Sequence, residues 1–289
     1  MKPETEQNLA TIEILTDGLS CSSVGTEPYG ILFWEVDEKG EFSFLKFLIE
    51  VKALTPLEVE EFLASLQRTR SKKTFRQYKE LINLLESNLS QLQFYSYNAP
   101  YLSKQHTNFY APYENIEFPL IIGSTPQGEW LAIAPWLSSK TGSTPPHLAI
   151  PSLEPTATTA NLIDRIETVT GNLARKTTRQ ELGENTNKWK VVVTSNPSNS
   201  LEKVLDNAGY INIDEIDRFW NVDLVEEAGN YFSIITLQEL KIKEFFKQQL
   251  IYPRVYNLYF YGGEYQVHYV LGKNRKGDTF CLFTDTYSW

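Results

Sequence analysis

Closely spaced carboxylates are the residues of this sequence that come nearest to a catalytic arrangement. Four of them share one stretch of the chain: Asp217, Asp223, Glu226 and Glu227. Paired carboxylates can serve as general acid and base, but the sequence positions neither a nucleophile nor a base beside this group. No HExxH, GxSxG, P-loop, GxGxxG or CxxC motif occurs, and three histidines are few for a metalloenzyme. We therefore expect no catalytic residues, metal ligands or cofactor, with an uncharacterised hydrolase as the enzymatic alternative.

The cysteines and the N-terminus bear on the compartment. Cys21 and Cys281 are 260 residues apart and form neither a disulfide framework nor a zinc-binding pattern, so we expect two reduced thiols. The N-terminal sequence MKPETEQNLATIE lacks the apolar core of a secretion signal. No stretch approaches the roughly 18 apolar residues that a membrane helix needs. These features predict a cytoplasmic protein that does not enter the membrane.

The balance of charge favours a protein partner over nucleic acid. The chain has 289 residues, with 27 Lys and Arg against 36 Asp and Glu, and therefore a net charge of −9. Binding along a phosphate backbone needs clustered positive charge. The basic run at residues 68–73 lacks interleaved aromatic residues, so we interpret it as a solvated loop and expect no direct contact with nucleic acid. An acidic protein suits a basic or metal-bearing partner.

The clearest change of composition lies at residues 141–160. This stretch, TGSTPPHLAIPSLEPTATTA, holds four prolines and seven serines or threonines but a single charged residue. Proline fixes φ and removes a backbone donor, so the composition is typical of an extended linker. We therefore predict a domain over residues 1–140, a linker over residues 141–160 and a second domain over residues 161–289.

The two predicted domains repeat the same order of elements. Each opens with an amphipathic helix whose apolar residues follow one helical face. These residues are Leu9, Ile12, Leu15 and Leu19 in the first domain, and Ile163, Ile166, Val169 and Leu173 in the second. A β-rich run follows at residues 31–36 and again at residues 189–194. A later helix is predicted at residues 77–89 and again at residues 238–250.

The repeat is sharpest in the hairpin that ends each half. Two glycines five residues apart bracket a polar turn at residues 123–128 and again at residues 272–277, 149 residues later. Glycines between two apolar runs predict a hairpin whose turn needs positive φ. We therefore expect an α+β fold of two tandem domains, each an antiparallel sheet packed by helices.

Several motifs of the first half resemble the cyanobacterial nuclease A inhibitor (NuiA) family. They are TDGL at residues 16–19, EPY at 27–29, LFWE at 32–35, LLESNL at 84–89 and IGSTPQG at 122–128. The similarity covers most of residues 5–137. The second half resembles a divergent copy, with VYNL at residues 255–258, VLG at 270–272 and GD at 277–278. The chain is thus similar to two tandem members of this family.

The resemblance implies α/β/α sandwiches that act by binding a protein. Members of the family inhibit sugar-non-specific, magnesium-dependent nucleases with an acidic loop after the first helix and with the C-terminal carboxylate. Carboxylate oxygens are hard ligands that Mg²⁺ accepts. The family's loop glutamate aligns with Val24, and Glu27 is the nearest carboxylate. The implied partner-binding residues are therefore Val24, Gly25, Thr26 and Glu27, together with the free carboxylate of Trp289.

An interaction module without nuclease inhibition is the alternative function. The first half carries an extra loop at residues 98–116 that is rich in aromatic residues. Long loops of this kind are often functional. In this alternative, the aromatic loop 98–116 and the surface between the domains bind another protein.

Overall fold

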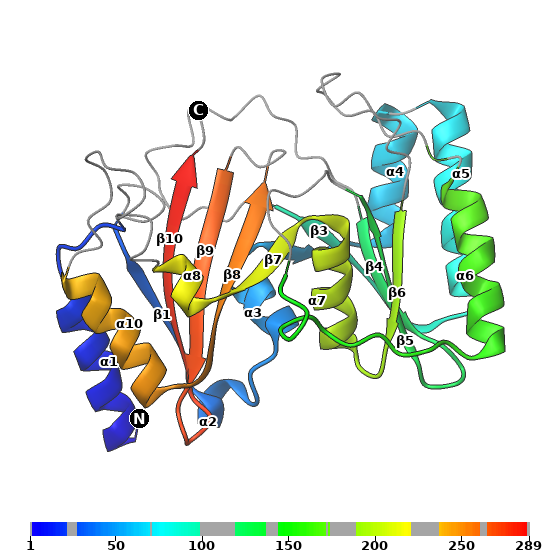
Figure 1. The fold of residues 1–289 in the computed structure, drawn as a ribbon. Helices are drawn as coiled ribbons and strands as arrows, with labels where there is room; N and C mark the ends of the chain where they lie inside the picture. Colours follow the sequence, from blue (N-terminus) through cyan, green and yellow to red (C-terminus); the bar gives the residue numbers. More distant parts are fainter. Residues whose placement is uncertain are drawn as a thin grey trace, which may run out of the picture. The chain divides into compact units, whose positions relative to one another are not determined.

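The computed structural model describes residues 2–21, 28–69, 71–98, 119–136, 144–171, 173, 189–220, 237–260 and 265–287. Within these ranges the protein is an α+β fold with two sheets of five strands each (Figure 1). Every strand pair in both sheets is antiparallel. The α+β class and the antiparallel sheets predicted from the sequence are therefore confirmed.

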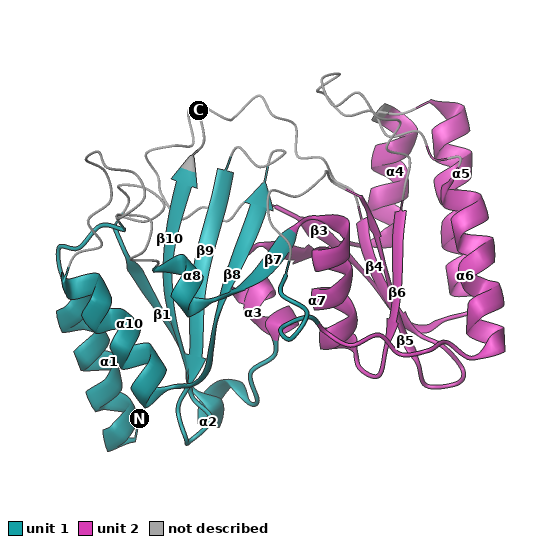
Figure 2. Cartoon of the chain, viewed as in Figure 1, with its two compact units in different colours: residues 1–43, 141–149, 211–289 teal, residues 44–140, 150–210 magenta. Residues whose placement is uncertain are grey.

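The chain forms two compact units (Figure 2). Unit 1 comprises Met1–Ser43, Thr141–Ala149 and Ile211–Trp289, and unit 2 comprises Phe44–Lys140 and Ile150–Tyr210. These discontinuous units differ from the predicted division into residues 1–140, 141–160 and 161–289. The stretch predicted as one linker is shared between them, with residues 141–149 in unit 1 and residues 150–160 in unit 2.

Unit 1 packs two long helices on its sheet. In spatial order, the strands are β1 (Gly30–Trp34), β10 (Thr279–Tyr287), β9 (Tyr265–Lys273), β8 (Ile251–Phe260) and β7 (Ile211–Glu215). The helices α1 (Pro3–Thr16) and α10 (Leu237–Gln249) run side by side, and the short helices α2 (Val36–Lys39) and α8 (Ile216–Phe219) follow β1 and β7 (Figure 1). The core between helices and sheet includes Ile12, Trp220, Phe246 and Phe280, all nearly fully buried.

Unit 2 has helices on both faces of its sheet. In spatial order, the strands are β2 (Leu54–Pro56), β3 (Ser90–Tyr97), β4 (Pro119–Ser124), β5 (Trp130–Pro135) and β6 (Trp189–Thr194). The helices α4 (Val59–Thr69), α5 (Lys72–Glu86) and α6 (Ala157–Thr170) cover one face, and α7 (Pro197–Ala208) covers the other (Figure 1). The remaining helix, α3 (Phe44–Glu50), contacts α7 and β2. The core under α4, α5 and α6 includes Phe62, Leu81, Ile133 and Ile166.

Each sheet combines strands from both halves of the sequence. The strand β1 comes from the first half, but it pairs with β10 and so completes the sheet of the second half. In the same way, β6 comes from the second half and pairs with β5 of the first. We call α1 with β1 arm 1, and α6 with β6 arm 2. The two halves therefore exchange arms, which is why the compact units do not follow the repeat along the sequence.

The two arms have matching residues. Thr5, Ile12 and Thr16 of α1 occupy the same positions as Thr159, Ile166 and Thr170 in α6, and both helices have 14 residues. Ile12 and Ile166 are buried at 1% and 0% exposure. The last threonine of each helix donates a hydrogen bond to the carbonyl four residues earlier. Apolar periodicity predicted the buried face of each arm only in part. Of the predicted residues, those that are buried are Ile12, Leu19, Ile166 and Leu173, and those only partly buried are Leu9, Leu15, Ile163 and Val169. Each helix also buries two threonines, which the apolar pattern did not include.

The hairpin turns confirm one predicted glycine role and correct another. Gly128 and Gly277 have φ of 80° and 92°, as expected for a turn that needs positive φ. Gly123 and Gly272 are not in that region; they allow close packing instead. A Cβ on Gly123 would lie 3.0 Å from Leu89, and one on Gly272 would lie 2.7 Å from Leu250.

Two further features bear on the sequence-based expectations. Of the helices within the described ranges, none has the length and apolar character needed to cross a bilayer. Of the aromatic loop 98–116, only Asn98 falls within the described residues, where its N–H donates to the carbonyl of Ala53 at 3.0 Å.

Candidate partner-binding site

The residues predicted to contact a partner lie outside the described residues. These are Val24, Gly25, Thr26, Glu27 and Trp289. The residues that flank them are described, and they belong to unit 1. On the N-terminal side, Ser20 pairs with Pro28 in a β-bridge, and the N–H of Tyr29 donates to the carbonyl of Leu19 at 3.2 Å. The two ends of the segment 21–27 are therefore held together at its base.

The strand register places the described residues next to both predicted contact segments at one end of unit 1. Gly30, the first residue of β1, lies opposite Phe283 of β10. From there, β1 leads back toward residue 27, while β10 continues to Tyr287, two residues before the C-terminus. Because the pair is antiparallel, the first residue of β1 and the last residue of β10 lie toward the same end of the sheet. The strand β1 comes from the first half and β10 from the second, so the exchange of arms is what places these two strand ends together.

Tyr29 fixes the base of the segment 21–27. Its hydroxyl donates to Glu239 Oε1 at 3.1 Å and accepts from Trp220 Nε1 at 2.9 Å. Burial, together with the neighbouring Cys21 and Glu239, raises the pKa of the Tyr29 hydroxyl well above its ordinary value. Tyr29 therefore stays neutral, and its hydroxyl links the residue that precedes β1 to Glu239 of α10 by a hydrogen bond.

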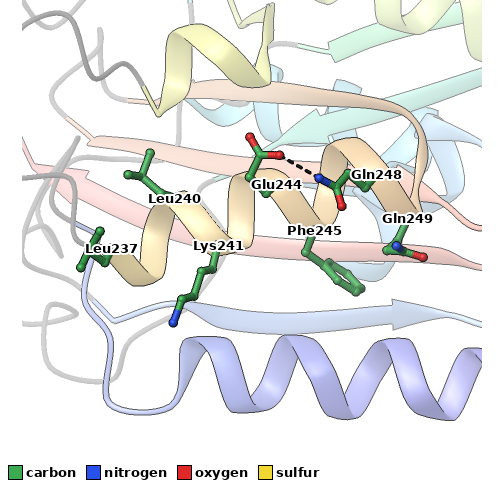
Figure 3. A pocket seen from close by; sticks show the side chains of 7 residues that line it. All are labelled: Leu237, Leu240, Lys241, Glu244, Phe245, Gln248 and Gln249. Carbon is green, nitrogen blue, oxygen red and sulfur yellow. Dashed lines mark hydrogen bonds between the residues drawn. The ribbon is translucent and has the colours of Figure 1, made fainter.

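Exposed apolar side chains lie near the same end of unit 1. Leu237 is the first residue of α10, two residues before the Tyr29 partner Glu239, and is 78% exposed. Ile14, in the last turn of α1, is 75% exposed. A shallow hollow of about 430 Å³ follows one stripe of α10 (Figure 3), where Gln248 Nε2 donates to Glu244 Oε2 at 3.0 Å. Exposed apolar groups rimmed by polar ones are typical of protein-binding surfaces.

A buried carboxylate fastens arm 1 to the sheet of unit 1. Thr5 Oγ1 donates to Asp278 Oδ2 at 2.7 Å, and the N–H of Val36 donates to Asp278 Oδ1 at 3.0 Å. Asp278 is only 1% exposed. Burial alone would raise the pKa of Asp278, but the hydrogen bonds from Thr5, Val36 and Asn274 outweigh it and lower the pKa.

In unit 2, the buried carboxylate of Glu129 holds arm 2 against the sheet. It accepts hydrogen bonds from the N–H of Thr156 at 2.8 Å, from Thr156 Oγ1 at 3.0 Å and from Thr159 Oγ1. Burial opposes ionisation, yet the hydrogen bonds from Thr159 and Thr156 lower the pKa of Glu129. The hydrogen bonds of Asp278 and Glu129 to the arms were not predicted from the sequence. The signal was present, because Glu129 and Asp278 are 149 residues apart and directly follow the matched turn glycines.

The buried His268 belongs to a polar network on the sheet of unit 1. Asn212 Oδ1 accepts from Asn257 Nδ2 at 2.7 Å and from Tyr259 Oη at 3.0 Å. This leaves Asn257 Oδ1 to accept from His268 Nδ1 at 2.6 Å. Burial lowers the pKa of His268 to about 4, so the imidazole is neutral at physiological pH. The histidine is thus a sheet residue with a hydrogen-bond partner on Nδ1.

The carboxylates considered for catalysis are not assembled with a base or nucleophile in the described part of the chain. Asp217 pairs with Lys243 at 2.8 Å and with Lys247 at 3.1 Å, and hydrogen bonds from these two lysines lower its pKa. Asp223, Glu226 and Glu227 lie outside the described residues. Within the described residues, no group of histidine, cysteine and acidic side chains could hold a metal ion.

Both cysteines are buried thiols. Cys21 and Cys281 have 0% and 3% exposure, and burial raises the pKa of the Cys281 thiol well above its ordinary value. A neutral, buried thiol is a poor nucleophile. Chemistry at Cys281 therefore does not contribute to the candidate site.

The candidate site is thus the end of unit 1 at which arm 1 and β10 meet, with Tyr29 at its base and Leu237 and Ile14 nearby. In comparisons with known proteins, no family model matches this chain, and neither a curated protein nor a solved structure does.

Proposed function

We propose that this protein acts without catalysis, by binding another protein at the end of unit 1 where β1 begins and β10 ends. The partner is a sugar-non-specific, magnesium-dependent nuclease, and binding blocks its active site in the cytoplasm. Each unit is, in this proposal, a NuiA-like α/β/α sandwich assembled from both halves of the chain. The proposal takes the partner class from the resemblance of the first half to the NuiA family.

The register of β1 and β10 is the observation that carries the proposal. Inhibition of the family type needs an acidic loop after the first helix and a free C-terminal carboxylate on one surface. Along the sequence, these two features belong to different repeats. Gly30 opposite Phe283 means that the strands leading to both features run side by side in unit 1.

The chemistry of the two segments fits a nuclease cleft. A site that holds phosphate beside Mg²⁺ also accepts carboxylate oxygens, because both are hard, anionic oxygen ligands. The net charge of −9 adds long-range attraction toward a basic cleft. In this proposal, Glu27 and the carboxylate of Trp289 approach the cleft, while Val24, Gly25 and Thr26 shape the loop that carries Glu27.

Titration of a magnesium-dependent, sugar-non-specific nuclease with the full-length protein tests the proposal. We expect inhibition at or below micromolar concentration. Glu27→Gln should weaken inhibition at least tenfold, about 1.4 kcal/mol, because it removes a charged ligand. Extension of the C-terminus by two glycines moves the free carboxylate and should weaken inhibition likewise.

The control for this titration is Glu154→Gln, which removes an exposed carboxylate from unit 2. Glu154→Gln should leave the inhibition constant unchanged. If inhibition depended only on the net negative charge, Glu154→Gln and Glu27→Gln would weaken it equally. Absence of inhibition at micromolar excess would overturn the nuclease proposal. An unchanged inhibition constant for Glu27→Gln would remove Glu27 from the mechanism.

Protein binding without nuclease inhibition is the second candidate function, and the exposure of Leu237 and Ile14 favours it. In this case the partner contacts the apolar surface beside α10 or the aromatic loop 98–116. Leu237→Glu should then reduce capture of the partner while the nuclease titration shows no effect. Capture that is unchanged by Leu237→Glu and abolished by deletion of residues 98–116 would assign binding to the aromatic loop.

A further inference from the structure

We propose that the two halves of this chain recognise each other through their arms, so that residues 1–149 and residues 150–289 remain one stable complex when the chain between them is cut. Arm 1 pairs with β10 of the second half, and arm 2 pairs with β5 of the first half. This inference concerns the assembly of the chain and does not depend on the proposed function.

Backbone pairing supplies the first part of this recognition. In unit 1, the five residues Gly30–Trp34 pair with Phe283–Thr279 in continuous register. In unit 2, six residues pair, from Trp130 opposite Thr194 to Pro135 opposite Trp189. Each arm therefore adds an outer strand to the sheet of the other half. Addition of a strand to a sheet edge is an established mode of peptide recognition.

Apolar burial supplies the second part. In the core of unit 1, Ile12, Leu19 and Cys21 come from the first half of the chain, and the other ten buried members come from residues 216–282 of the second. In unit 2, Leu162, Ile166 and Leu173 come from the second half and pack among residues of the first. Neither core is complete without the arm, and removing the arm would expose its apolar surface to water.

Buried hydrogen bonds between the halves supply the third part. Asp278 of the second half holds Thr5 and Val36 of the first, and Glu129 of the first half holds Thr156 and Thr159 of the second. The same relation occurs in both directions, at matching positions of the repeat. A carboxylate left buried without its donors is costly, so each of these contacts disfavours separation.

The arrangement is bivalent. After a cut between Ala149 and Ile150, the first fragment still contributes residues 1–43 and 141–149 to unit 1 and residues 44–140 to unit 2. The second fragment contributes residues 211–289 to unit 1 and residues 150–210 to unit 2. When one unit opens, the other keeps the fragments at high effective concentration, so separation requires both to open together.

The test is a full-length protein with a protease recognition sequence inserted between Ala149 and Ile150. After complete cleavage, we expect a single particle with the mass of the whole chain in size-exclusion chromatography with light scattering, down to nanomolar concentration. Fragments that separate at micromolar concentration would overturn the proposal. If the insertion prevents folding, co-expression of residues 1–149 and 150–289 with one affinity tag gives the same readout, by co-purification.

A second measurement separates arm exchange from an ordinary contact between two independently folded domains. Cleaved fragments are separated in urea and refolded one at a time. Arm exchange predicts that neither fragment regains native near-ultraviolet circular dichroism as a monomer and that mixing restores it. A fragment that refolds alone to a native monomer would overturn the proposal.

The buried carboxylates give a matched comparison on the cleaved protein. Asp278→Asn combined with Glu129→Gln should raise the dissociation constant of the fragments at least tenfold. Glu154→Gln, which removes an exposed carboxylate near the cut, should leave it unchanged. Equal dissociation constants for the double variant and the control would contradict recognition through the arms.

Discussion

At the scale of single residues, Asp278 connects three segments that are far apart in the sequence. It accepts hydrogen bonds from Thr5 of α1 and from the N–H of Val36, and it directly follows the turn glycine Gly277 in the β9–β10 hairpin. Asn274 belongs to the same hydrogen-bond network, because its Nδ2 donates to Thr5 Oγ1 at 3.2 Å. One carboxylate thus positions the arm on which the candidate partner-binding site depends.

Asp278→Asn should lower the free energy of unfolding by about 1–3 kcal/mol, because it weakens several buried hydrogen bonds and leaves donors poorly matched. Urea unfolding followed by circular dichroism measures the effect. Asp37→Asn is the matched control: its carboxylate is 62% exposed in a surface pair with Lys2 at 2.8 Å, which predicts about 0–1 kcal/mol. Equal effects of the two substitutions would mean that Asp278 does not fasten the arm.

His268 predicts an acid-sensitive unfolding equilibrium. Its pKa is about 4 in the folded protein, against 6.5 for a free histidine, so below pH 6.5 the unfolded state binds more protons. The stability associated with neutral His268 is fully present above pH 6.5 and is lost as the pH falls toward about 4, by about 3 kcal/mol in total. Unfolding measured between pH 7 and pH 4 on the wild type and His268→Gln tests this. The same pH slope in both proteins would exclude His268 as its source.

At the scale of elements, leucines that follow α5 and α10 pack against a glycine of the hairpin in each unit. A Cβ on Gly272 would lie 2.7 Å from Leu250, which directly follows α10, whereas a Cβ on Gly123 would lie 3.0 Å from Leu89. These matched contacts explain why the hairpin motif keeps its first glycine in both halves. Glycine is therefore needed at these two positions because a side chain would collide with the neighbouring leucine, and not because the turn needs positive φ.

Gly272→Ala should therefore destabilise the protein by about 1–3 kcal/mol, the usual cost of overpacking a core. Gly123→Ala should cost less, because its neighbours need to move only a few tenths of an ångström. Thermal unfolding of the two variants measures the difference. A larger loss for Gly123→Ala would contradict the packing explanation.

Sequence patterns predicted the elements better than their partners. The strand predicted at residues 189–194 is β6 itself, and the helix predicted at residues 238–250 is α10, shifted by one residue. The helix predicted at residues 77–89 begins earlier, at Lys72, because Ser71 caps it by accepting from the N–H of Thr74. Local periodicity and capping determine these elements, so they can be predicted from nearby residues.

The exchange of arms could not be predicted in the same way. The two arms carry equivalent apolar faces, and both fit a sheet of the same type. Nineteen residues separate β1 from β2 and sixteen separate β6 from β7, which is enough chain to pass from one sheet to the other. The choice of sheet depends on contacts far apart in sequence, such as Thr5 with Asp278. The sequence therefore indicated two separate segments for partner binding, but not the pairing of the strands β1 and β10 that lead to them.

At the scale of the whole molecule, the exchange gives the two units different roles in the proposed function. Unit 1 combines the segment leading to Glu27 with the strand that ends two residues before the C-terminus. In unit 2, the strand equivalent to β10 is β5, and the chain continues beyond it. Two tandem inhibitors would each bind a nuclease, whereas our proposal assigns nuclease binding to unit 1 alone.

The most direct test is the stoichiometry of binding, measured by isothermal titration calorimetry of the full-length protein with a magnesium-loaded, catalytically inactive sugar-non-specific nuclease. The account predicts one nuclease per chain, and loss of that binding when the C-terminus is extended by two glycines. Two nucleases per chain, or no binding at micromolar concentration, would contradict it.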